Sequence, residues 1–387
     1  MFESVWRSLE QQVAAGWAPG IVAGIRHQGK TEYFATGTLA FDPDHPAQAG
    51  PAPSDGDQPM RTDTRFRIAS LSKPVGAAVA LSMIADGLFA LDDPVAPWLP
   101  ELAEPRVLKT PDGPLDQTVP ADKPITVRHL LTMTFGLGGF SSELQDAPIA
   151  NAFAAALGYG LRRPFDGDEY MARLSSVPLA YQPGMRFMYH SGFDVLSVLI
   201  ARVAGRPLHA VLEERINAPL GLISTSFQAD GAALPAAYRM TERGGLEAFP
   251  EYEEAFTEPP RFESFGGGLV STVEDYLTFL QAIAEGGLLP AELLQDLTTA
   301  QLTDEQRVGI GSDADRLSWT LGFGVDLAVT DPWTEVGRYG WSGGSGTSAA
   351  TDPSRGLIGV VLTQRFISGP QDDFAYFWEP LAKVLRE

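Results

Sequence analysis

Apolar and polar residues alternate at both ends of the chain, a pattern that predicts β-strands. Residues 21–37 hold two β-rich runs around a turn at residues 27–30, so we expect a hairpin there. Near the C-terminus, four short runs separated by turn residues predict four more strands, over residues 319–329, 335–343, 346–353 and 357–365. Residues 374–387 are expected to close the chain as a helix.

The middle of the chain carries helical patterns instead. Apolar spacing, alanine content, glycine stops and Ser or Thr caps predict helices within residues 70–91, 125–139, 189–222 and 271–287. The third stretch predicts two helices, because Gly205 is suited to end the first and Pro207 to open the second. Glu274 lies in the first turn of the last helix, where an acidic side chain is favourable.

Strands at both ends with helices between them predict an α/β (α+β) fold. We expect an antiparallel sheet flanked by helices, formed by both chain ends, with an inserted mainly helical domain. The 387 residues fit one large domain or two interleaved ones. We assign residues 1–67 and 263–387 to the α/β domain and residues 68–262 to the helical domain, with the active site between them. Residues 42–64, rich in Pro, Gly and Asp, predict a long surface loop.

Charge and composition narrow the function. A net charge of -21 argues against nucleic acid as a partner, because phosphates require a basic surface. Without cysteine the chain has no disulfide, thiolate nucleophile or thiolate metal site, and we expect neither metal nor cofactor. The first residues lack the apolar run of a secretory signal, and the longest apolar run, from Pro74, contains Asp86 and Gly87. We therefore expect a soluble, cytoplasmic protein without a membrane span.

One serine motif lies near the C-terminus. Residues 340–344, GWSGG, match G-x-S-x-G, the nucleophile elbow in which a strained strand-to-helix turn exposes a serine. About a quarter of a match arises by chance with 40 Gly and 23 Ser, so the motif is weak. The elbow needs a helix directly after the serine and a histidine later in the chain, whereas all histidines precede Ser342: His27, His45, His129, His190 and His209. Ser342 could act only in a different fold that uses an earlier histidine.

A second serine lies where a base can reach it. Ser70 and Lys73 are three residues apart, so on a helix the ammonium stands beside the hydroxyl. Pro74 supports a helix that begins near Ser70, because proline is tolerated in the first turn. A lysine can be the base only if its pKa falls from about 10.4 to roughly 7 to 8. Alone, the motif is weak, since 23 Ser and 5 Lys give about 0.3 chance matches and the pair could merely cap and solvate a helix.

Two further motifs follow in order along the chain. Tyr189-His190-Ser191 precedes a predicted helix, and Trp341-Ser342-Gly343 lies in a predicted strand. Together with Ser70-x-x-Lys73, they resemble the three motifs of the serine β-lactamase and penicillin-binding-protein superfamily, on its class C side. Those motifs are Ser-x-x-Lys, Tyr-x-Asn or Tyr-x-Ser, and Lys-Thr-Gly or a variant such as Trp-x-Gly. The resemblance covers nearly the whole chain and includes residues 19–30, 125–137, 218–227 and 266–280.

The resemblance implies a fold of the β-lactamase/transpeptidase type and a role for each motif residue. Ser70 attacks a carbonyl carbon and forms an acyl-enzyme. Lys73 and Tyr189 share the proton transfers, and which of them is the base stays open. Ser191 relays protons or fixes Lys73 by a hydrogen bond, whereas His190 is expected to point away as a structural residue.

The third motif implies an oxyanion hole. The backbone N–H of Gly344 is expected to join that of Ser70 there, and Gly343 and its neighbouring glycines let substrate approach the strand. Trp341 replaces the lysine found in β-lactamases and peptidases, and an indole offers an apolar face and one N–H donor instead of a partner for a carboxylate. With Ser191 in place of asparagine, the chain is similar to the family VIII carboxylesterases and related acyltransferases.

The leading hypothesis is therefore a serine hydrolase that forms an acyl-enzyme at Ser70, a carboxylesterase that acts on neutral esters. Its expected partner is a small-molecule ester, thioester or amide. An acyltransferase or amide synthase that uses the same acyl-enzyme is the alternative, followed by a β-lactamase or D-amino-peptidase. A non-catalytic sensor is disfavoured because Ser70, Lys73 and Tyr189 are all retained. Residues 140–170 and 245–265 are expected to roof the pocket, and the sequence leaves the acyl group, the acceptor and the oligomeric state open.

Overall fold

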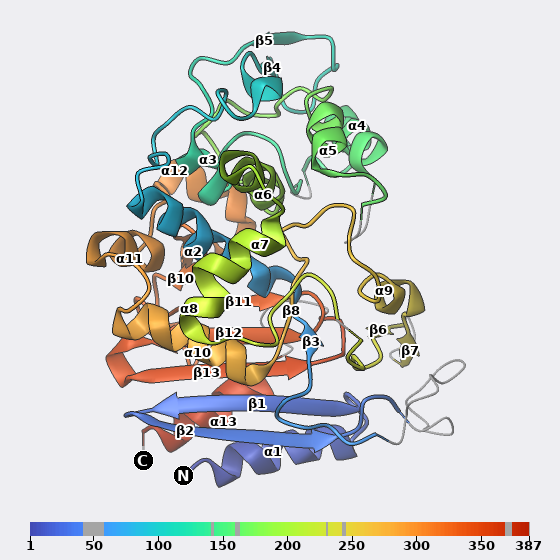
Figure 1. Cartoon of the computed structure of the whole chain (residues 1–387), viewed down its shortest axis with the longest axis vertical. Coiled ribbons are helices and arrows are strands. Elements are labelled where there is room, and N and C mark those ends of the chain that lie inside the picture. Colours follow the sequence, from blue (N-terminus) through green and yellow to red (C-terminus); the bar gives the residue numbers. More distant parts are fainter. Residues whose placement is uncertain are drawn as a thin grey trace.

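A computed structural model shows a large sheet with helices on both faces and a mainly helical part beside it (Figure 1). The structure describes residues 1–41, 58–140, 143–158, 163–229, 231–241, 245–367 and 374–386. In these residues the sheet has seven strands, paired antiparallel in the order β2 (Lys30–Gly37), β1 (Gly20–His27), β13 (Leu357–Thr363), β12 (Thr347–Asp352), β11 (Tyr339–Gly343), β10 (Gly324–Asp326) and β9 (Leu317–Trp319). The predicted fold, a sheet from both chain ends with a mainly helical insertion, is confirmed.

The predicted hairpin is confirmed, and the first C-terminal run differs from its prediction. Strands β1 and β2 pair from Gly20 opposite Gly37 to His27 opposite Lys30. The run over 319–329 was predicted as one strand, but it contains the end of β9, a turn and β10. The turn forms because the Thr320 hydroxyl accepts the backbone N–H groups that follow it in the chain, which breaks the extended backbone.

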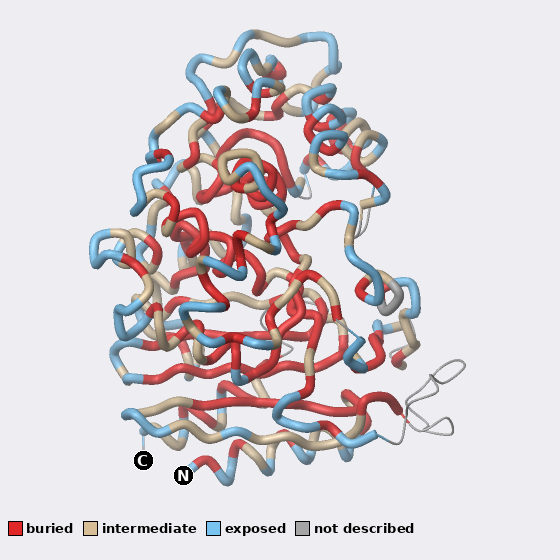
Figure 2. The backbone as a smooth tube through the Cα atoms, in the orientation of Figure 1, coloured by how far each residue is buried: buried red, intermediate tan, exposed pale blue. Residues whose placement is uncertain are grey.

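Two layers of helices cover the sheet. Helices α1 (Glu3–Ala14) and α13 (Ala375–Val384) pack against each other on one face, and α10 (Val273–Glu285) packs on β1 and β13 from the other. Strand β1 is therefore buried along most of its length, while β2 at the edge is largely half-buried, as Figure 2 shows. Helix α1 has no counterpart among the predicted elements.

The rest of the chain forms helices and short strand pairs on the α10 side of the sheet. Helices in this part are α2 (Ser72–Ala85), α3 (Val127–Leu131), α4 (Pro148–Leu157), α5 (Gly167–Leu174), α6 (Ser191–Ala204), α7 (Leu208–Leu212), α8 (Ala218–Leu220), α9 (Pro250–Glu254), α11 (Ala291–Thr298) and α12 (Asp304–Arg307). Strand pairs are β3 (Phe66–Arg67) with β8 (Val270–Ser271), β4 (Arg106–Leu108) with β5 (Thr118–Pro120), and β6 (Tyr238–Met240) with β7 (Leu246–Ala248).

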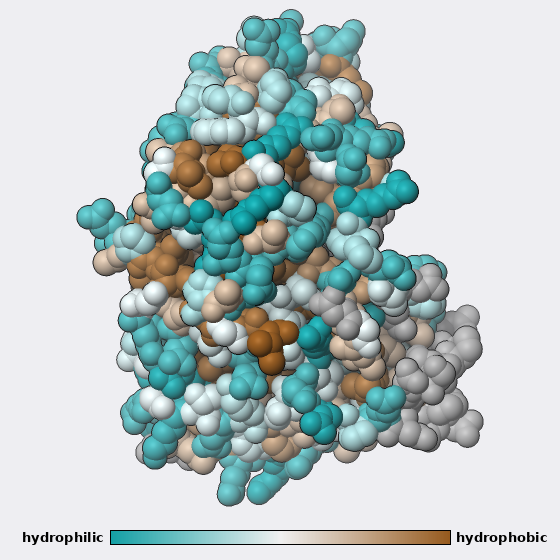
Figure 3. All heavy atoms as spheres, in the orientation of Figure 1, coloured by the Kyte–Doolittle hydropathy of each residue, from teal (hydrophilic) through white to brown (hydrophobic). Residues whose placement is uncertain are grey.

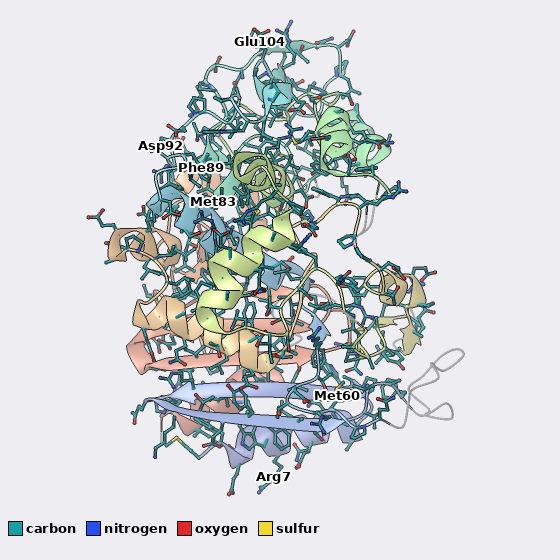
Figure 4. All side chains as sticks on the ribbon, viewed as in Figure 1. Arg7, Met60, Met83, Phe89, Asp92 and Glu104 are labelled. Carbon is teal, nitrogen blue, oxygen red and sulfur yellow. The ribbon has the colours of Figure 1, made fainter. Side chains whose placement is uncertain are left out.

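Helix α2 is the central core helix, although it is shorter than the predicted stretch of residues 70–91. A single 3-10 turn, Ala69–Leu71, precedes it, and it ends at Ala85 because Gly87 adopts a positive φ of 73°. Met83 and Phe89, labelled in Figure 4 near the end of α2, are both buried in the core.

The domain division at residues 67 and 263 stays a prediction. Of the predicted loop over 42–64, residues 42–57 lie outside the described part of the chain. Its described end folds back on the sheet, where the side chain of Met60, labelled in Figure 4, packs against Gly20.

The face drawn in Figure 3 is mostly hydrophilic, with a few separate apolar patches. Within the described ranges, no single helix has the length and apolar composition of a membrane span. Helix α6 and the helical segment Leu208–Leu220 reach that length and composition only when they are taken together, and they are bent by 80° relative to each other.

Candidate active site

Ser70 lies in the short 3-10 turn before α2, and this turn packs against strand β11. The turn is fixed from the sheet side, because the hydroxyls of Ser345 and Thr347 donate to the carbonyl oxygens of Arg67 and Ile68. Ser70 remains partly exposed, whereas Ser72 and Lys73 behind it are fully buried. A hydroxyl at this position is open to a substrate on one side and has the core on the other.

The ammonium group of Lys73 stands directly behind the Ser70 hydroxyl. Its Nζ lies 3.0 Å from Ser70 Oγ and 2.6 Å from the carbonyl oxygen of Gly266, and it lies 4.6 Å from the centre of the Tyr189 ring. Burial lowers the pKa of Lys73 to about 7, although the negative charge of Asp194 raises it in part. Near neutral pH a large share of Lys73 is therefore the free amine, which can accept a proton from Ser70.

Tyr189 completes this group from the segment that leads into α6. Its hydroxyl oxygen accepts a 2.6 Å hydrogen bond from the indole N–H of Trp341. Burial raises the pKa of Tyr189 to about 12, and the hydrogen bonds with Ser70 and Trp341 offset only part of that rise. Tyr189 is therefore a protonated phenol at neutral pH, which can donate a proton but is a weak base.

His190 was expected to point away from the other motif residues, but its side chain points toward Lys73. It is the central residue of a γ-turn, with φ 82° and ψ -65°, closed by a hydrogen bond from Ser191 N to Tyr189 O. This backbone turns the imidazole inward, so that its Nδ1 lies 3.4 Å from Lys73 Nζ. The prediction assumed an extended backbone, and a positive φ at histidine cannot be seen in the sequence pattern.

Strained backbone is concentrated at this site. Four non-glycine residues in the described ranges have a positive φ, and three of them, Ala69, Met133 and His190, belong to this site or directly adjoin it. Ala69 directly precedes Ser70, and the sulfur of Met133 accepts the backbone N–H of His190 at 3.1 Å. Such conformations persist only where the surrounding structure enforces them, and they mark functional sites more often than other positions.

Asp194, one turn into α6, is the buried anion of the site. It accepts hydrogen bonds from the hydroxyls of Ser264 and, at 3.2 Å, Tyr170, and its carboxylate lies 3.5 Å from His190 Nε2. Ser264 in turn accepts the backbone N–H of Gly266 at 2.8 Å. Asp194, Ser264 and Tyr170 were not predicted as members of this group, and a lone Asp on an apolar helix was the available signal.

Ser191 is buried near Ser70, Lys73 and Tyr189 but is not among the residues that contact Lys73. Lys73 Nζ contacts Ser70, Gly266 and His190, so His190 takes the place at Lys73 that had been expected for Ser191. Ser191 is buried, and its side chain interacts with Tyr170. Its expected part in proton relay stays a prediction.

The GWSGG stretch contributes strand β11, which packs against the turn that holds Ser70. Gly343 is buried directly against Ile68, whose carbonyl oxygen would collide with any added Cβ, whereas a Cβ on Gly344 would meet open space. Ser342 lies within the strand rather than in a strand-to-helix turn, and its hydroxyl donates to Ser348 Oγ at 3.3 Å.

A cavity of about 630 Å³ opens beside Tyr189 and Trp341. Its lining includes the aromatic and apolar side chains of Phe140, Phe187 and Ile310. The lining also includes two arginines, both paired with aspartates: Arg316 with Asp313 at 2.8 Å and Arg338 with Asp326 at 3.3 Å. Of the two stretches expected to roof the pocket, the first contributes Phe140, and the segment 309–317, which sequence analysis missed, forms another wall.

No group of three or more His, Asp or Glu side chains in the described ranges is placed to hold a metal ion.

Comparisons with known proteins agree with this arrangement. A family model described as Beta-lactamase matches residues 6–379. Protein Rv1367c from Mycobacterium tuberculosis is 37% identical over 332 residues, 80% of this chain and 80% of that protein. Esterase EstB from Burkholderia gladioli is 32% identical over 342 residues, 83% of this chain and 82% of that protein. The solved structure of EstCE1, described as a hydrolase with promiscuous acyltransferase activity, is similar in fold, with a TM-score of 0.78 and 24% identity over 100% of this chain and 98% of that chain.

Proposed function

Because the chain belongs to the Beta-lactamase family, as the three motifs had indicated, we propose that it is a serine hydrolase that forms an acyl-enzyme at Ser70 and acts on neutral carboxylic esters. One observation carries the proposal: the fully buried Lys73 lies 3.0 Å from Ser70 Oγ with its pKa lowered to about 7. A buried amine that is partly neutral at physiological pH is suited to act as a general base, and Ser70 is the hydroxyl within its reach.

In the acylation step, the proton of Ser70 moves to Lys73 Nζ while Oγ bonds to the ester carbonyl carbon. The carbonyl electron pair moves to its oxygen, which the backbone N–H groups of Ser70 and Gly344 would stabilise. When the tetrahedral intermediate collapses, the bond to the alcohol oxygen breaks and Tyr189 donates a proton to that oxygen. The ammonium of Lys73 then restores the proton of Tyr189, and water hydrolyses the ester at Ser70 by the same steps in reverse.

The substrate preference follows from Trp341 and from the cavity beside it. The indole N–H is already donated to Tyr189, so the third motif offers no cation for a substrate carboxylate. The arginines that line the cavity are likewise paired with aspartates. A neutral ester whose alcohol or acyl group is apolar near the reacting carbon fits this site better than an anionic β-lactam or peptide. Nucleic acid is not a proposed partner, and a cytoplasmic location stays a prediction.

A covalent probe tests the nucleophile. We expect a fluorophosphonate to add to the wild-type protein once, with loss of fluoride, and peptide mapping to place the phosphonyl group on Ser70. Ser70→Ala should not be labelled, and Ser342→Ala should be labelled at nearly the wild-type rate. Labelling of Ser342, or none in folded wild-type protein, would overturn the proposal.

A second candidate, acyl transfer to an alcohol or amine, is favoured by one feature. The cavity adjoins Tyr189, the group that would protonate the leaving alcohol, so the same space can hold an acceptor in place of water. EstCE1, of similar fold, is described as having promiscuous acyltransferase activity. Product analysis of p-nitrophenyl butyrate turnover with added 1-butanol distinguishes the two functions, because a transferase forms butyl butyrate in preference to butyrate.

A further inference from the structure

The neutral form of Lys73 must be oriented if it is to act as a base. An ammonium has three donors, and the structure offers it three acceptors: Gly266 O at 2.6 Å, Ser70 Oγ at 3.0 Å and His190 Nδ1 at 3.4 Å. A neutral amine has two N–H donors and one lone pair. If the two donors bind Gly266 and His190, the lone pair is left facing the Ser70 hydroxyl.

His190 can accept this hydrogen bond only in one tautomer. Burial, together with the neighbouring charge of Lys73, lowers the pKa of His190 to about 4, so the ring is neutral at pH 7. Its Nε2 faces the carboxylate of Asp194 at 3.5 Å, which favours a proton on Nε2 and leaves the lone pair of Nδ1 toward Lys73.

Asp194 also holds the second acceptor. Through the Ser264 hydroxyl, which accepts the backbone N–H of Gly266, it fixes the carbonyl that binds Lys73. Glycine at position 266 leaves room for this arrangement, because a Cβ there would lie too close to Asp194 and His190. The two acceptors of Lys73 are thus tied to one carboxylate on α6.

We propose that His190 is a positioning residue that, held by Asp194, turns the lone pair of neutral Lys73 toward Ser70. This inference rests on the proposed function, because it assigns His190 a role in the same proton transfer. The positive φ of His190 supports it, since the strained turn is what brings the imidazole to Lys73. The titratable side chains near His190 are Lys73 and Asp194, and Tyr189 lies next to Lys73. Tyr170 donates a hydrogen bond to Asp194, and the positive charge of Arg163 also lowers the pKa of His190.

The test compares two substitutions at residue 190. His190→Gly relieves the positive φ and removes the acceptor, whereas His190→Asn tolerates the backbone and supplies an amide oxygen near the position of Nδ1. With p-nitrophenyl butyrate, we expect kcat/KM to fall about 30-fold or more in His190→Gly and to stay within about fivefold in His190→Asn, with KM little changed in either. Since the His190 side chain is 33% exposed, added imidazole should restore part of the activity of His190→Gly.

The pH profile separates positioning from a structural role. Loss of an acceptor destabilises the ammonium, so the acid limb of kcat/KM should move to lower pH in His190→Gly. Asp194→Asn should move it the same way, because the carboxylate raises the pKa of Lys73. The matched control is His129→Asn, which removes another histidine of lowered pKa that bonds the backbone of Thr126 and should leave the profile unchanged.

The outcomes are distinct. Wild-type activity and an unshifted profile in His190→Gly would overturn the inference, as would equal losses in the Gly and Asn variants with no imidazole rescue. Melting temperatures of all variants show whether a loss reflects unfolding; if His190→Gly does not fold, the His190→Asn and Asp194→Asn profiles decide the question. Fluorophosphonate labelling of wild-type Ser70 is read separately, so failure of the proposed function is recognised before the variants are compared.

Discussion

Ser70 and Ser342 lie on segments that pack against each other, yet their surroundings differ in whether a base can remove the proton of the hydroxyl. Behind Ser70 stands a buried amine with a pKa lowered to about 7. The hydroxyl of Ser342 instead donates to Ser348, which also accepts the indole N–H of Trp378 from α13. Both serines sit in motifs typical of nucleophiles, but only one has a base within reach. A serine motif therefore predicts a nucleophile only together with the group that removes its proton.

The largest contrast should come from removing each hydroxyl. We expect Ser70→Ala to lower kcat/KM for p-nitrophenyl butyrate by about 10⁴-fold or more, because among the described residues Ser70 carries the one serine or threonine hydroxyl that is hydrogen-bonded to Lys73. Ser342→Ala should stay within about fivefold of wild type, since it removes one hydrogen bond in a strand. The reverse ranking would make Ser342 the nucleophile.

Removing the base should separate activity from stability. Lys73→Met should lower kcat/KM by about 10³-fold, the range of general-base catalysis. It should also stabilise the fold at pH 6 by about 1–3 kcal/mol, because the unfolded chain binds a proton at Lys73 that the folded chain holds less tightly. This gain should shrink as pH rises from 7 toward 10.5, where the unfolded lysine also loses its proton. Melting temperatures at pH 6, 8 and 10 measure it; a gain that grows with pH would contradict the lowered pKa.

The wild-type pH profile gives the next largest effect. Because the active form of Lys73 is the free amine, kcat/KM should fall about tenfold per pH unit below 7 and be roughly 100-fold lower at pH 5 than on the plateau. Tyr189, with its pKa raised to about 12, should remain protonated through pH 10, so no alkaline limb is expected there. An acid limb that lies near pH 9 instead of near 7, and that disappears in Tyr189→Phe, would make the phenolate the base.

Gly343, the last residue of β11, and Gly344, which follows it, test how closely the two serine regions must pack. Gly343→Ala places a methyl group against the Ile68 carbonyl and should destabilise the fold by about 1–3 kcal/mol. Gly344→Ala, its matched control, meets open space and keeps the backbone N–H, so its melting temperature should equal that of wild type. Equal melting temperatures for the two variants would show that the contact with Ile68 is not tight.

The sequence by itself determined the elements and the reactive pair. Local periodicity predicts the hairpin and the central helix, and three-residue spacing predicts that Ser70 and Lys73 lie side by side, since both signals depend only on neighbouring residues. The order of the three motifs was enough to indicate the family. Element ends were less certain, because Gly87 and Thr320 act through turn geometry that periodicity does not report.

Only the tertiary structure decided the electrostatics and the orientation of the site. The pKa of Lys73 depends on its burial beneath segments far away in the chain, and its acceptors at Gly266 and His190 are 193 and 117 residues distant. The inward turn of His190 depends on a strained φ that its residue type disfavours. Asp194 has no local pattern to mark it, because its partner Ser264 lies 70 residues away. Such features arise from long-range packing, which composition and spacing do not encode locally.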